Sequence, residues 1–173
     1  KLSTSSAASD VYKRALTNRR ASCTYYADKY FSAVRDSKRG ILYSGSLDIS
    51  IDGSECVFTT NSIPNHNFND STASFATNVS VVPAEFRTAI AGVFADFNTP
   101  LTLSYDNAVM LNGVKIDLLA AGCFGVGNGN IGCNDINQPW RYDPMSPLAR
   151  FGTDIHNAHT QPDGPYHYHG NPQ

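Results

Sequence analysis

Four of the five histidines in this chain lie close together near the end of the sequence. His156 and His159 are three residues apart, and His167 and His169 alternate with tyrosines. Side chains two apart on a strand project from the same face, and a pair three apart can converge on one ion from a helical turn or a tight loop. The turn sequence Asp163-Gly-Pro between the pairs could fold the first pair back onto the second.

Imidazoles at this spacing indicate a first-row transition metal, because imidazole nitrogen is a preferred ligand of zinc, copper, nickel and iron. We therefore predict a copper or zinc site whose ligands come from five histidines: His156, His159, His167, His169 and, from a distant polar loop, His66. Asp154 and Asp163 are candidates to orient the rings as hydrogen-bond acceptors. A structural hydrogen-bonding cluster and a solvated tail without fixed geometry are the alternatives.

Length and charge narrow the class of protein. The 173 residues fit one domain that can bury its own core. Charged residues make up 16% and the net charge is −2, so there is no basic surface of the kind that binds nucleic acid. The longest apolar run, residues 118–126, is too short for a membrane span. No signal peptide is visible at Lys1, which predicts a cytosolic protein or a mature form whose leader has been removed.

The four cysteines favour the second of these possibilities. They form no C-x-x-C pair, and an even number suits two disulfides in an oxidising compartment, extracellular or periplasmic. Cys123 and Cys133 flank a glycine-rich loop and are predicted to pair locally, which leaves Cys23 with Cys56. Four buried free thiols are the alternative. Asn134-Asp, at the end of the glycine-rich loop, is a calcium candidate that we favour less than a transition metal.

Two segments carry hairpin signals. Apolar residues alternate with polar ones over residues 47–51, Asp52-Gly53 follows, and apolar residues return at 56 and 58. Residues 109–111 and 114–118 similarly flank Asn112-Gly113. Both dipeptides are preferred in two-residue hairpin turns.

The remaining segments leave some choices open. Residues 22–34 and 83–97 fit either a helix or a strand, whereas residues 101–105 alternate as a strand does. The balance predicts a mainly β fold, an antiparallel β-sandwich or barrel-like single domain with minor helix and long loops. We expect this domain to cover residues 22–173, after a flexible N-terminal segment at residues 1–21.

The chain resembles the secreted YHYH proteins, a family named for the motif found here as Tyr166-His-Tyr-His169. The resemblance covers roughly residues 22–171 and extends to five further segments, at residues 62–70, 111–121, 122–133, 138–145 and 156–164. It implies secretion and a shared role for the histidines, and it implies no substrate.

These features favour a secreted metal-binding protein. The sequence contains no Gly-x-Ser-x-Gly elbow and no H-E-x-x-H motif, and no independent catalytic constellation is visible. A metal-dependent hydrolase or oxidase is an alternative if the ion keeps an open position. The other alternative is a structural matrix or filament subunit that self-associates through sheet edges or through metal.

Overall fold

The computed structural model describes residues 20, 22–69, 78–92, 96–98, 106–117, 122–126, 138, 140–146 and 152–173. Within these residues the chain forms one short 3-10 helix and eight strands: η1 (Cys23–Tyr26), β1 (Asp28–Arg35), β2 (Leu42–Asp52), β3 (Glu55–Thr60), β4 (Ala84–Ala89), β5 (Ala108–Val109), β6 (Lys115–Ile116), β7 (Ala158–Thr160) and β8 (Tyr166–Tyr168). The predicted mainly β fold with minor helix is therefore confirmed. No helix in the described part of the chain is long and apolar enough to cross a membrane.

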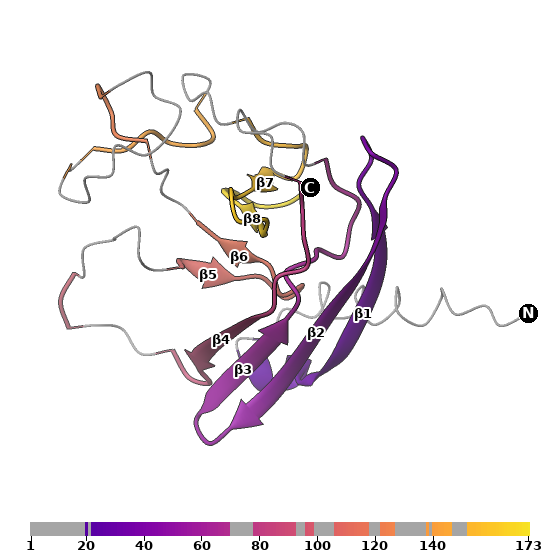
Figure 1. Ribbon diagram of the computed structural model, residues 1–173. Helices are drawn as coiled ribbons and strands as arrows, with labels where there is room; N and C mark the ends of the chain where they lie inside the picture. Colours follow the sequence, from indigo (N-terminus) through magenta and orange to yellow (C-terminus); the bar gives the residue numbers. More distant parts are fainter. Residues whose placement is uncertain are drawn as a thin grey trace, which may run out of the picture.

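The first sheet is an antiparallel meander in the order β1-β2-β3-β4 (Figure 1). Its central hairpin was predicted, but the turn lies one residue later than expected. Asp52 pairs with Glu55, so Gly53 and Ser54 form the turn. Gly53 has a φ of 58°, a left-handed conformation that glycine adopts without a steric penalty.

Two segments that the sequence left open between helix and strand contain strands. Residues 22–34 form η1 and most of β1, and residues 83–97 contain β4. Phe86 lies opposite Phe58 of β3, and Phe86 and Ile90 pack against the same core. Side chains four apart share a face in a strand as well as in a helix, which explains why spacing alone could not decide.

The second sheet has the order β5-β6-β8-β7. The predicted hairpin around Gly113 is present, since β5 and β6 pair antiparallel on either side of it. Its turn is longer than the two residues expected, because the amide of Met110 donates to the carbonyl of Val114 and residues 111–113 form the loop. The predicted turn near Asp163 is also confirmed, because β7 and β8 form an antiparallel pair across it. The pairing of β6 with β8 is parallel, unlike the antiparallel fold expected. Within the described residues the two sheets stay separate, and no closed barrel forms.

Two clusters of buried side chains form the core. One joins the two sheets and consists of Val34, Ile63, Phe68, Val79, Val114, Ala158, Tyr166 and Tyr168. The other is formed by side chains of η1 and the first sheet and consists of Tyr26, Tyr30, Leu47, Ile49, Cys56 and Phe58. The first cluster matters most for the site, because the two β8 tyrosines belong to it.

The Cys23–Cys56 disulfide is present as predicted and ties η1 to β3. Cys123 is also disulfide-bonded, but its predicted partner, Cys133, lies outside the described residues. The predicted N-terminal segment at residues 1–21, apart from Arg20, the predicted strand at residues 101–105 and the calcium candidate at residues 134–135 lie outside them too.

Candidate metal centre

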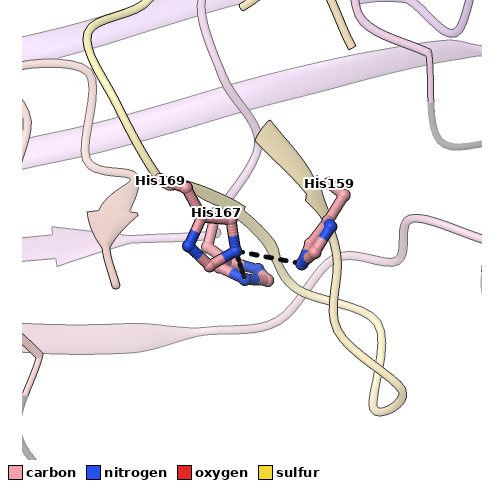
Figure 2. Close-up of side chains that lie close together, drawn as sticks. All are labelled: His159, His167 and His169. Carbon is pink, nitrogen blue, oxygen red and sulfur yellow. Dashed lines mark hydrogen bonds between the residues drawn. The ribbon is translucent and has the colours of Figure 1, made fainter. Parts of the chain in front are cut away.

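The pairing of β7 with β8 brings three histidines together. His159 of β7 lies directly opposite His167 of β8. His169 is two residues further along and points from the same face as His167, so it is the diagonal neighbour of His159. Figure 2 shows the three rings directed toward one another. All three side chains are buried, with exposed fractions of 3%, 2% and 7% in chain order.

The Nε2 atoms of these rings converge. Nε2 of His169 lies 3.0 Å from Nε2 of His159 and 3.0 Å from Nε2 of His167, the two contacts dashed in Figure 2. The three ring centroids are each 4.7 Å apart, and the ring planes cross at 72–79°. One ligand atom from each ring lies within 4.8 Å of the others, so this triad could hold a metal ion.

Hydrogen bonds on the far side of two of the rings decide where the protons of those rings lie. Nδ1 of His159 is 2.8 Å from the carbonyl oxygen of Gly152, and Nδ1 of His169 contacts the carbonyl oxygen of Asp117. A carbonyl oxygen only accepts hydrogen bonds, so both Nδ1 atoms must carry the proton. In the neutral rings, Nε2 of His159 and Nε2 of His169 therefore carry no proton, and their lone pairs face each other.

Burial keeps these rings neutral. It lowers the pKa of His159, and it lowers the pKa of His169 to about 4. The pKa of His167 lies well below its ordinary value, again chiefly because of burial, with smaller contributions from the other two rings. Near neutral pH the triad thus presents neutral imidazoles, the form that binds metal.

Three charged side chains lie beside the triad. The Lys115 ammonium contacts the carboxylate of Asp117 at 2.9 Å and that of Asp106 at 3.0 Å. After burial and the neighbouring rings, the Lys115 charge further lowers the pKa of His167 and His169. The carboxylate of Asp117 also accepts a 3.1 Å hydrogen bond from Gln161. Lys115 is thus already paired with carboxylates, which reduces its repulsion of a cation in the triad.

The other two predicted ligands lie elsewhere. His66 and His156 stack on each other with ring centroids 3.7 Å apart. Nδ1 of His156 is 2.8 Å from the Gln173 carbonyl oxygen, and the His66 ring contacts Tyr168. Since Tyr168 alternates with His167 and His169 along β8, this stack lies on the opposite face of the strand from the triad. Metal binding by His66 or His156 stays a prediction.

The tyrosines of the motif occupy that opposite face. The Tyr166 hydroxyl donates a 2.6 Å hydrogen bond to the carboxylate of Asp154. The same carboxylate accepts from the backbone N–H groups of Asn69, His156 and Ala158. Asp154 therefore joins β8 to the turn that leads into β7, where His159 lies.

These contacts correct the expected roles of the aspartates. Asp154 was expected to orient a ring, but it holds the turn before β7 and the Tyr166 hydroxyl instead. Asp163 is exposed in the turn between β7 and β8. The ring-orienting acceptors are the carbonyl oxygens of Gly152 and Asp117. Sequence reasoning missed both, because every residue carries a carbonyl and its position depends on the fold.

A family model described as "YHYH protein" matches residues 85–173. The match is shorter than the resemblance expected from about residue 22, but it covers slightly more than half of the chain and contains all three histidines of the triad. No curated protein and no solved structure matches the chain. The chain belongs to the YHYH protein family.

Proposed function

We propose that this chain is a secreted protein that binds one transition-metal ion, copper or zinc, through His159, His167 and His169. The observation that carries the proposal is the 3.0 Å separation between Nε2 of His159 and Nε2 of His169. Neither atom carries a proton in the neutral rings, so their lone pairs repel each other unless a cation lies between them. A shared proton is disfavoured there, because burial lowers the pKa of both rings.

The donor set supports a transition metal. Zinc–imidazole bonds of about 2.0–2.1 Å in a tetrahedron place neighbouring nitrogens about 3.3 Å apart. The two 3.0 Å separations from Nε2 of His169 lie close to this value, and the ligand atoms of His159 and His167 lie within 4.8 Å of each other. Calcium, by contrast, takes six to eight oxygen ligands. Three protein ligands leave a fourth position for water or another molecule, and a bound ion would act there as a Lewis acid.

The burial of the triad supports a site within one chain. The three rings come from β7, from β8 and from the residue that follows β8, and all are at least nine-tenths buried. An ion that tied subunits together would be expected at exposed histidines contributed by different chains. The Cys23–Cys56 disulfide is consistent with an oxidising compartment, and this supports secretion.

Elemental analysis of natively purified, untagged protein tests the proposal. We expect about one copper or zinc ion per chain, because the triad forms one site. The double variant His167→Ala with His169→Ala should lose that ion. His156→Ala is the matched control, because it removes an imidazole from the neighbouring stack and leaves the triad intact.

Reconstitution of the protein with added metal can refute the proposal. Protein that is purified without metal and takes up neither zinc(II) nor copper(II) at neutral pH would refute the proposal. Retention of one ion by the double variant would also refute it, because the site would then lie elsewhere. Loss of the ion from His156→Ala would show that the ligand set extends beyond the triad.

A further inference from the structure

Residues 61–69, which follow β3, connect the first sheet to the tyrosine face of β8. The amide of Phe68 donates to the carbonyl of Arg35, at the end of β1, and the carbonyl of Phe68 accepts from the amide of Ser37. The Phe68 ring packs against Tyr166, with centroids 5.2 Å apart. Phe68 therefore ties this loop to both sheets, by backbone pairing at the end of β1 and by ring packing against β8.

His66 of this loop makes a hydrogen bond to β8. Its Nδ1 is 2.8 Å from the carbonyl oxygen of Asn67, so Nδ1 carries the proton and Nε2 accepts. The acceptor Nε2 receives the Tyr168 hydroxyl at 2.5 Å. The side chain of Asn112 donates to the same hydroxyl oxygen at 2.8 Å. The buried phenol thus has both a donor and an acceptor, and both ring nitrogens of His66 are engaged.

Tyr168 lies between two members of the triad in sequence. Its side chain is fully buried on the face of β8 opposite His167 and His169. Its carbonyl accepts the amide of Asp117 at 2.9 Å, and the carbonyl of Asp117 in turn orients the His169 ring. Any rotation of β8 about its own axis that moved Tyr168 would also move the two imidazoles on the other face. The hydrogen bond from Tyr168 to His66 opposes that rotation.

We propose that His66 is a positioning residue of the metal centre, which acts through the Tyr168 hydroxyl to hold His167 and His169 at the ion. The inference rests on the proposed metal binding. It assigns a role to a residue outside residues 85–173, the part of the chain that the family model matches. The loop at residues 61–69 thereby supports the triad from the side away from the ion.

Zinc(II) affinity, measured in the full chain by competition with a chromophoric chelator, tests this role. We expect His66→Ala to weaken zinc binding about tenfold, the lower end of the range for groups behind the ligands. Tyr168→Phe should have a similar effect, and the double variant should be little worse than either single variant, because both remove one interaction. His66→Gln keeps an acceptor for the hydroxyl and should restore most of the affinity. Phe31→Ala, at an exposed position of β1, is the control.

X-ray absorption of the zinc-loaded variants separates a positioning role from ligation. We expect three coordinated imidazoles in the wild type and in His66→Ala. One imidazole fewer in His66→Ala would overturn the proposal, because His66 would then be a ligand. Unchanged affinity in both His66→Ala and Tyr168→Phe would also overturn it. A wild-type chain that binds no zinc(II) or copper(II) would instead refute the proposed function itself.

Discussion

Acid is expected to destabilise the metal-free protein, because the fold buries neutral histidines that the unfolded chain protonates. The clearest case is His169, whose pKa falls from 6.5 to about 4 in the folded protein. Between these values the unfolded state binds more protons than the folded state, so stability rises with pH in that window. The contribution of His169 to the free energy of unfolding is complete above pH 6.5 and is lost as the pH falls toward 4.

The size of the effect follows from the two pKa values. The full difference is on the order of 3 kcal/mol, of which about 2 kcal/mol is lost between pH 7 and pH 5. The pKa values of His159 and His167 are lowered too, so their protonation acts in the same direction. Burial raises the pKa of Asp117, which acts in the opposite direction. A comparison of variants is therefore needed to isolate His169.

Urea unfolding with excess chelator at pH 7 and pH 5 provides the measurement. We expect the wild type to lose about 2 kcal/mol more than His169→Gln over this range, because glutamine does not titrate. Zinc(II) in place of the chelator should move this loss of stability to lower pH, since a bound ion competes with protons for the ring nitrogens. Equal pH dependence in the two chains would refute the claim that His169 is held neutral by burial.

Two further predictions concern the framework around the site. Replacing Cys23 and Cys56 by serine should lower the free energy of unfolding by about 4 kcal/mol, because the disulfide closes a loop with a sequence separation of 33. Urea unfolding measures this difference, and a variant as stable as the wild type would contradict the prediction. Tyr166→Phe should lower the free energy of unfolding by about 1–3 kcal/mol, because the buried carboxylate of Asp154 loses a hydrogen bond. Asp154→Ala should lower it further, because several donors then lose their acceptor. Calorimetric unfolding measures both variants, and a smaller loss in Asp154→Ala would contradict the prediction.

The sequence predicted the features of the site that depend on neighbouring residues. The alternation of the motif placed His167 and His169 on one face, and the turn residues near Asp163 predicted the return of the chain. The hairpins around Gly53 and Gly113 followed from the same kind of local chemistry. Strand period and turn conformation are set over a few residues, so they can be predicted without knowledge of the rest of the chain.

The choice between the first two histidines depended on strand register. The spacing of His156 and His159 suggested that both could face one ion. In the fold, β7 begins at Ala158, so His159 lies on the strand opposite His167 while His156 remains in the preceding turn. Register depends on the fit of whole faces of the sheet, and the spacing of two histidines does not contain that information.

The long-range contacts were decided only by tertiary structure. The carbonyl oxygens of Gly152 and Asp117 orient two rings of the triad, those of His159 and His169, and nothing in the residue types marks them. His66 meets Tyr168 across a sequence separation of 102 residues. Sequence by itself determined that imidazoles gather on one strand face after a turn, because those patterns are local. The pairing of β7 with β8 determined which imidazoles meet. The wider tertiary structure determined which carbonyls hold them and which loop supports them, because these contacts join residues that are distant in the chain.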